Sequence, residues 1–167
     1  MNHGIIICKC KKGYMKIRVT GNINYALRKQ VRHAAFFYGK KLMPNHIFDE
    51  LHLHIKYTKL KHIDGICEDV DDYDPARYFK ITLTPRRDKV EVFSTLAHEM
   101  VHVRQMAKNI LMSHQTNHDV MIWKRKHYVE SEFENTELPW EVEAYGLENV
   151  LFNEYVDTHN LKDYFYK

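Results

Sequence analysis

The chain has 167 residues, of which 44% are hydrophobic, 28% charged and 13% aromatic, and its formal net charge is +3. This composition predicts one globular domain over residues 1–167, excludes long disordered tracts, and gives too weak a basic excess to indicate nucleic-acid binding by itself. No apolar run approaches the roughly 20 residues of a membrane span, so we expect a cytoplasmic protein with no membrane partner. The three cysteines Cys8, Cys10 and Cys67 lack a framework spacing, which fits reduced thiols in that compartment.

The N-terminal quarter of the chain predicts a hairpin followed by a long helix. Residues 5–8 and 15–19 are strand-like runs, and a lysine-glycine segment between them supplies the turn. A helix is expected over residues 25–42, because apolar side chains recur there at helical spacing. Asn22 or Asn24 precedes this helix and is a suitable cap for its first turn.

The middle of the chain predicts further strands and a second helix. Residues 51–57 alternate apolar and polar side chains, which is typical of a half-buried strand. Residues 65–67 begin a second strand, and residues 78–83 form a third. The acidic segment 69–74 lacks the ligand spacing of a calcium loop and is expected to be a solvated loop. A strongly apolar helix is expected over residues 89–111.

The last third of the chain predicts one irregular segment and one helix. Residues 112–137 are polar and show no period typical of a helix or strand. The final helix is expected to begin near Pro139, since proline is favoured in a first helical turn, and to continue to about residue 155. The chain shows no internal repeat and no linker, as expected for a single domain.

Two histidines in the second predicted helix have the spacing of metal ligands. His98 and His102 are four residues apart, which places both imidazoles on one helix face within reach of a single ion. Zinc binds neutral imidazole readily, and a catalytic zinc site keeps one position open. Glu99 follows the first histidine, so its carboxylate can take a proton from water at that open position. This H-E-x-x-H pattern indicates a zinc metallopeptidase.

The neighbouring residues favour a metal site over an ordinary exposed helix. A buried helix that carries two histidines and a glutamate would leave costly unpaired polar groups unless these residues share a task. The apolar residues of the segment are Val90, Phe93, Leu96, Ala97, Met100, Val103, Met106 and Ala107.

A catalytic zinc site also needs a third protein ligand. Glu141 and Glu143 on the last predicted helix are the leading candidates. At about 100° per residue, these two glutamates lie on opposite flanks of the apolar stripe, so both can hardly face one ion. Helical periodicity alone does not choose between them.

Three motifs in a fixed order resemble a known family. They are TLAHEMVHVRQ at residues 95–105, WK at residues 123–124 and LPWEVEA at residues 138–144. Together they resemble the small SprT-like metallopeptidases of tailed phages, within the wider glutamate-zincin group, over about residues 65–150. The resemblance implies a zincin-like α+β fold, with a small, mostly antiparallel sheet, an N-terminal helix, the HExxH helix and a C-terminal helix that bears the glutamate ligand. It also implies the host cytoplasm and a cleft bordered by residues 78–83, whose strand edge would bind an extended peptide.

The resemblance further implies the roles of individual residues. In the glutamate-zincin group the third ligand is the first glutamate of an E-x-x-A pattern, which here is Glu141, with Glu143 as a neighbouring carboxylate. Related enzymes usually carry an aspartate after the alanine to orient a ligand histidine. This chain has Tyr145 there, whose hydroxyl would orient the histidine or polarise a substrate carbonyl. SprT-domain proteins use a third histidine, which leaves His118 and then His114 as alternative ligands.

The sequence therefore predicts a zinc-dependent metallopeptidase that acts on proteins or peptides with Glu99 as the general base. Tyr145, Tyr128 and His127 are candidates for stabilising the oxyanion. Two alternatives stay open: a DNA-associated SprT-like protease, and a non-catalytic binding module stabilised by metal, against which the intact Glu99 argues. The basic residues available to contact DNA phosphates are Lys9, Lys11, Lys12, Arg28, Lys29, Arg32, Lys40, Lys41 and residues 124–126.

Overall fold

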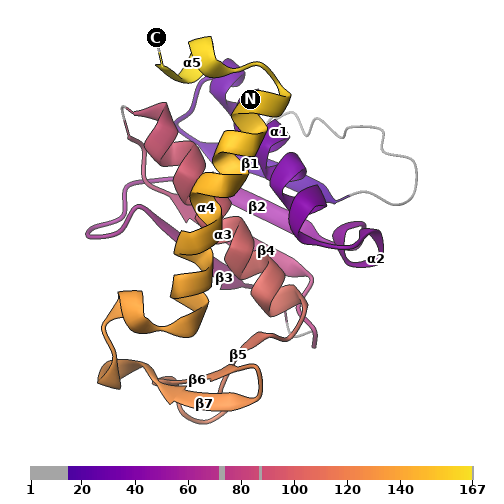
Figure 1. The fold of residues 1–167 in the computed structure, drawn as a ribbon. Coiled ribbons are helices and arrows are strands. Elements are labelled where there is room, and N and C mark those ends of the chain that lie inside the picture. The colour runs from indigo at the N-terminus through magenta and orange to yellow at the C-terminus, as the bar shows by residue number, and fades with distance from the viewer. Residues whose placement is uncertain (1–14, 72–73, 87, 167) are drawn as a thin grey trace.

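The computed structural model describes residues 15–71, 74–86 and 88–166 and has an α+β fold with two sheets (Figure 1). The predicted strand at residues 5–8 lies outside the described residues. In chain order the elements are β1 (Lys16–Gly21), α1 (Tyr25–Leu42), α2 (Asn45–Phe48), β2 (His52–Tyr57), β3 (Gly65–Asp69), β4 (Tyr78–Leu83), α3 (Lys89–Ala107), β5 (Leu111–Ser113), β6 (Val120–Trp123), β7 (Lys126–Val129), short 3-10 turns at Glu130–Glu132 and Asn135–Glu137, α4 (Pro139–Thr158) and α5 (Lys162–Tyr166). None of the described helices is long and apolar enough to cross a membrane.

The larger sheet has four strands in the order β1-β2-β4-β3. The pairs β1–β2 and β2–β4 are parallel, and β3–β4 is antiparallel, so the expectation of a mostly antiparallel sheet is wrong. The crossover through α1 returns the chain in the same direction, which makes β1 and β2 parallel. The expected free edge at residues 78–83 is also wrong, because β4 lies between β2 and β3. The outer strand at this side of the sheet is β3.

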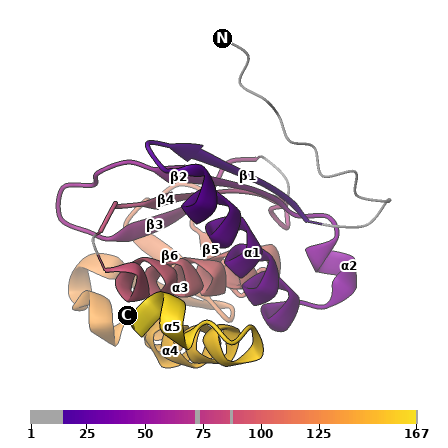
Figure 2. The same cartoon turned by 90° about the horizontal axis from the view of Figure 1, so that it is seen from above.

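The helices cover one face of this sheet in two successive layers. Figure 2 shows α1 and α3 beneath the sheet, with α4 and α5 on the far side of α3. Alternate strand residues such as Val19, Ile55 and Ile81 point toward the helices and are buried. The residues between them form the opposite face, which no described helix covers (Figure 2).

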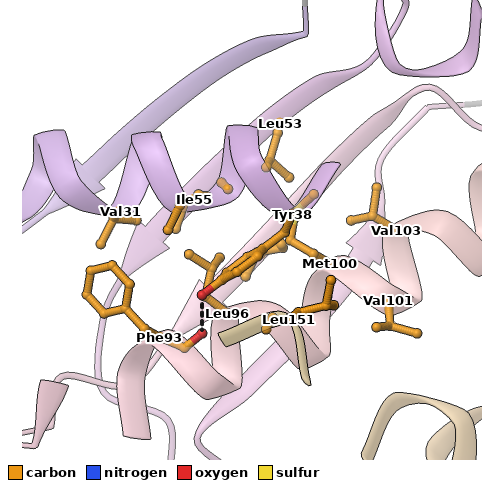
Figure 3. Packing of buried hydrophobic residues seen from close by; sticks show 14 of the residues in the cluster. Val31, Tyr38, Leu53, Ile55, Phe93, Leu96, Met100, Val101, Val103 and Leu151 are labelled. Carbon is orange, nitrogen blue, oxygen red and sulfur yellow. Dashed lines mark hydrogen bonds between the residues drawn. The ribbon is translucent and has the colours of Figure 1, made fainter. Parts of the chain in front are cut away.

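The core lies between the sheet, α1 and α3. Figure 3 shows Val31 and Tyr38 of α1 packed among Phe93, Leu96 and Met100 of α3. The hydroxyl of Tyr38 donates a hydrogen bond to the Phe93 carbonyl over 3.3 Å, which satisfies the one polar atom of a fully buried side chain. Because α3 lies between the sheet and α4, it is apolar on most of its circumference.

Capping side chains set the starts of the two central helices. The Asn24 carboxamide oxygen accepts a hydrogen bond from the Leu27 amide at 2.8 Å, so Asn24 rather than Asn22 caps α1. The Asp88 carboxylate accepts from the Val90 amide at 2.7 Å and caps α3.

The expectation of irregular structure over residues 112–137 is wrong. Strands β5, β6 and β7 form a three-stranded antiparallel sheet. The helix expected over residues 89–111 ends at Ala107, and Leu111 is the first residue of β5. The turn between β6 and β7 consists of Lys124 and Arg125, both with positive φ (49° and 69°). Glycine or asparagine usually marks such turns, so this one gives no sequence signal. Trp123 of β6 and Trp140 of α4 pack in a separate apolar cluster that attaches this sheet to α4.

Candidate metal centre

Helices α3 and α4 bring three ligand-type side chains together. His98 and His102 come from successive turns of α3, and Glu141 comes from the first turn of α4. One donor atom from each lies within 4.8 Å of the other two. The Nε2 atoms of the histidines are 3.1 Å apart, and the Glu141 oxygens lie 3.1 Å from His98 Nε2 and 3.3 Å from His102 Nε2.

These distances fit a metal ion bound by all three side chains. With bonds of about 2.0–2.1 Å, neighbouring ligand atoms around a tetrahedral zinc lie about 3.3 Å apart. Two imidazoles and one carboxylate are also the donor set of one class of catalytic zinc site. Of the two glutamates that periodicity could not separate, Glu141 faces the histidines. His114 and His118 lie on or beside the small sheet and belong to no such group among the described residues.

A carboxylate that the sequence analysis missed holds the first histidine. Nδ1 of His98 lies 2.9 Å from a carboxylate oxygen of Glu148 on α4. With its Nδ1–H donated to Glu148, His98 presents a lone pair on Nε2 to a metal. Glu148 is seven residues after Glu141, two turns along the same helix face, and this spacing was the available sequence signal.

A neutral amide holds the second histidine. Nδ1 of His102 lies 2.8 Å from Oε1 of Gln105, which is fully buried. The Nε2 amide group of Gln105 donates to the Trp140 carbonyl at 3.0 Å and to Glu143 at 2.9 Å. Glu143 also pairs with Arg104 at 2.9 Å. The second glutamate therefore supports the Gln105 side chain and does not face the histidines.

The charges of the group depend on one another. Burial lowers the pKa of His98, but hydrogen bonds with Glu141 and Glu148 and the nearby Glu99 outweigh it and raise the value to about 9. Burial raises the pKa of Glu141, but hydrogen bonds and charge interactions with His102 and His98 lower it to about 2. A carboxylate that stays ionised in a partly buried site is well suited to a cationic ligand.

Glu99 lies beside this group and takes no part in it. The side chain is 5% exposed, and burial raises its pKa to about 7 against the opposing charges of His102 and His98. Gly65 of β3 lies against it: a Cβ at position 65 would be 2.6 Å from Glu99 Oε1 and 2.6 Å from Thr95 Cγ2. Glycine at this position therefore allows β3 to lie close to the functional face of α3.

The residues predicted to assist the oxyanion have different surroundings. Tyr145 packs its ring against that of His98, with centroids 4.7 Å apart, and is 45% exposed. His98 Nδ1 donates its orienting hydrogen bond to Glu148 and not to the Tyr145 hydroxyl. Tyr128 packs against Trp140 and Phe133, while His127 lies near His114 in the small sheet.

A cavity of about 430 Å³ lies beyond the metal centre along α3. It is lined by Asp69 of β3, Met106 of α3, His114 just after β5 and His127 of β7. Met106 is one helical turn beyond His102, so the cavity adjoins the ligand face of α3.

No family model, curated protein or solved structure matches the chain. The resemblance to SprT-like metallopeptidases therefore depends on the three sequence motifs. The structure itself contains a buried His/His/Glu group that could hold a metal ion.

Proposed function

We propose that this protein is a zinc-dependent metallopeptidase with a zincin-like fold, related to the SprT-like metallopeptidases of tailed phages. The observation that carries the proposal is the convergence of His98, His102 and Glu141 beside the separate, buried carboxylate of Glu99. A site that used metal for stability alone would not need a further buried carboxylate next to its ligands, because burying a carboxylate costs free energy.

The proposed chemistry divides the work between the metal and the chain. Zinc held by His98, His102 and Glu141 supplies Lewis acidity, which polarises a peptide carbonyl and lowers the pKa of water toward about 7. Glu99 accepts the proton of the attacking water and delivers it to the leaving amine. Glu148 and Gln105 keep the two imidazoles in the tautomer that presents Nε2.

The proposed substrate is an extended stretch of protein or peptide. Among the described residues, β3 pairs with β4 on one side and has no strand on the other. An extended chain can add to such an edge through main-chain hydrogen bonds. Because Gly65 at the start of β3 contacts Glu99, a peptide on this edge would run past the metal centre toward the cavity at Asp69.

A comparison of two matched glutamine variants tests the proposal. The zinc-loaded wild type is expected to cleave a mixed library of unstructured peptides, with products identified by mass spectrometry. Glu99→Gln is expected to lower the cleavage rate by about 10²–10⁴-fold, because it removes the proton acceptor. Its zinc content should stay at the wild-type level, since Glu99 is not in the ligand group.

The control is Glu91→Gln, which changes the same charge in the first turn of the same helix. It is expected to retain wild-type activity. Equal rates for wild type and Glu99→Gln, or no zinc-dependent cleavage of any library peptide by wild type, would count against a peptidase and favour a metal-stabilised binding module.

A further inference from the structure

The outer face of the four-stranded sheet collects basic side chains from three strands. The register of β1, β2 and β4 places Lys16, His52 and Tyr78 in one row across the strands, and Arg18, His54 and Lys80 in the next row on the same face. Lys56 lies two residues beyond His54 on the same face of β2. Strands are about 4.8 Å apart and alternate residues about 6.6 Å apart, so these groups form one compact basic face.

Two carboxylates lie near this face among the described residues, Glu68 and Asp71, and Asp71 accepts a hydrogen bond from the Tyr78 amide at 2.9 Å. Lys80 pairs with Glu68 of β3 over 2.7 Å, whereas Lys16, Arg18 and Lys56 are exposed and have no acidic partner among the described residues. The pKa of His54 is lowered by burial and by its neighbours Arg18, Lys80 and Lys56, in agreement with this clustering. Like charges held close together on adjacent strands repel one another, and a bound polyanion would relieve that repulsion.

Basic and acidic residues are also unevenly distributed along the chain. Residues 1–129 contain 23 Lys or Arg and 12 Asp or Glu, whereas residues 130–167 contain two Lys and ten Asp or Glu. The acidic part includes α4, which lies on the side of the helix layer away from the sheet (Figure 2). The acidic excess around α4 therefore repels an anionic polymer from that side of the molecule, whereas the basic face of the sheet attracts it.

An aromatic pair lies at one end of the basic face. The ring of Tyr78 lies over that of His52, with centroids 4.7 Å apart and an interplanar angle of 31°. Tyr78 is 45% exposed, so its ring is accessible from solvent. Proteins that bind single-stranded nucleic acid combine a basic surface with exposed aromatic rings on which unpaired bases stack. A duplex keeps its bases stacked internally and cannot use such a ring.

We propose that the outer sheet face binds single-stranded nucleic acid, with phosphates on Lys16, Arg18 and Lys56 and a base stacked on Tyr78. The described basic residues that the sequence alone suggested lie instead on α1 and at the β6–β7 turn. The proposed site is also separate from the metal centre, because the sheet lies between this face and α3 (Figure 2). Binding here does not depend on peptidase activity.

Fluorescence anisotropy with the full-length, zinc-loaded protein and a labelled oligothymidylate of about 20 nucleotides tests the proposal. Three phosphate contacts at about 0.7 counterions each predict that affinity falls about 20-fold between 50 and 200 mM salt. The triple variant Lys16→Gln, Arg18→Gln, Lys56→Gln is expected to bind about 100-fold more weakly at 0.1 M salt. Tyr78→Ala is expected to weaken binding about tenfold without changing the salt dependence.

The matched control replaces Lys124, Arg125 and Lys126 by glutamine. It removes the same three charges from the β6–β7 turn and the first residue of β7 (Figure 1). This control is expected to bind within about threefold of wild type, because it removes none of the proposed phosphate contacts and lowers only the overall positive charge. Circular dichroism on every variant checks that the fold is intact.

Four results of the oligonucleotide experiments would each overturn the proposal. They are no saturable binding by wild type, equal weakening by the two triple variants, an unchanged affinity in Tyr78→Ala, and binding of a duplex as tight as that of the single strand. Retention on vesicles that contain phosphatidylserine, without retention of the oligonucleotide, would assign the basic face to a membrane surface and would also overturn it.

Discussion

The molecule contains two histidine pairs with nearly the same ring geometry and opposite surroundings. At the metal centre the rings of His98 and His102 have centroids 4.8 Å apart and planes at 76°. Between α1 and the end of α4, the rings of His33 and His159 are 4.6 Å apart at 80°. The geometry of an imidazole pair therefore does not distinguish the candidate ligand site from a packing contact.

The difference lies in the groups around each pair. Carboxylates of Glu141 and Glu148 contact His98, and the pKa of that histidine is raised despite burial. His33 instead contacts the Tyr155 hydroxyl at 3.0 Å, and its pKa is lowered by burial, His159 and Lys29. One pair is held among groups that attract a cation, and the other among groups that disfavour one. A metal site needs the anionic partner as much as the imidazoles.

The largest expected effect is a loss of zinc affinity when the anionic ligand Glu141 is removed. The His98–His102 pair would then lack its carboxylate partner, as the His33–His159 pair does. In Glu141→Gln the two imidazoles stay, but the carboxylate that faces both is lost. We expect the affinity for zinc, measured by calorimetry, to fall by more than about 100-fold, which is the upper end of what removal of a supporting residue costs. Glu154→Gln is the matched control, since Glu154 lies on the same helix and pairs with Lys41. Equal losses in both variants would contradict the assignment of Glu141.

Gln105→Met should disturb the second histidine and the fold together. The methionine side chain has a similar volume but removes the acceptor for His102 and the donor to Trp140 and Glu143. We expect the affinity for zinc to fall about 10–100-fold and the free energy of unfolding to fall about 1–3 kcal/mol, because buried polar groups lose their partner. Chelator competition and urea denaturation measure the two quantities. Gln115→Met, at an exposed position, serves as control. An unchanged free energy of unfolding in Gln105→Met would show that the hydrogen bonds of Gln105 do not stabilise the fold.

Glu148→Gln should have a smaller effect confined to the metal centre. An amide oxygen can still accept the hydrogen bond from His98 Nδ1, but the negative charge beside the imidazole is lost. We expect the affinity for zinc to fall about tenfold, with little change in stability, because Glu148 is partly exposed. Glu154 lies on the same helix and pairs with Lys41, far from the ligands. The control variant Glu154→Gln should therefore bind zinc like wild type. The same affinity in both variants would mean that Glu148 does not tune the site.

Local patterns were sufficient for several elements of the fold. The helix expected over residues 25–42 and the strand over residues 78–83 are confirmed as α1 and β4, because helical spacing and strand alternation are properties of a single segment. Alternation does not specify the partner strand or its direction, and so it did not reveal the parallel pairs of β2. The turn at Lys124 and Arg125 lacked glycine, so the small sheet was missed.

The candidate site also has parts that local sequence patterns predict and parts that they do not. The spacing of His98 and His102 is a property of one helix, and it placed both imidazoles on one face. The choice of Glu141 needed a resemblance to a family, and the roles of Glu148 and Gln105 needed the packing of α4 against α3. The position of one helix against another is a tertiary property, and side-chain periodicity does not contain it.

The smallest expected effect is on the pH dependence of stability, and it concerns the His33–His159 pair. It tests whether the surroundings of this pair disfavour a positive charge. The pKa of His33 is lowered in the folded state, so folding favours its neutral form. This contribution to stability is present above the ordinary histidine pKa of about 6.5 and is lost as the pH falls through the folded value. When the pH is lowered from 7.5 to 5, the thermal midpoint of His33→Gln should therefore fall less than that of wild type. The Tyr155 hydroxyl keeps a partner in this variant, because Gln30 still donates a hydrogen bond to it. A steeper fall in the variant would mean that protonated His33 is stabilised in the fold, and the electrostatic contrast between the two pairs would then be wrong.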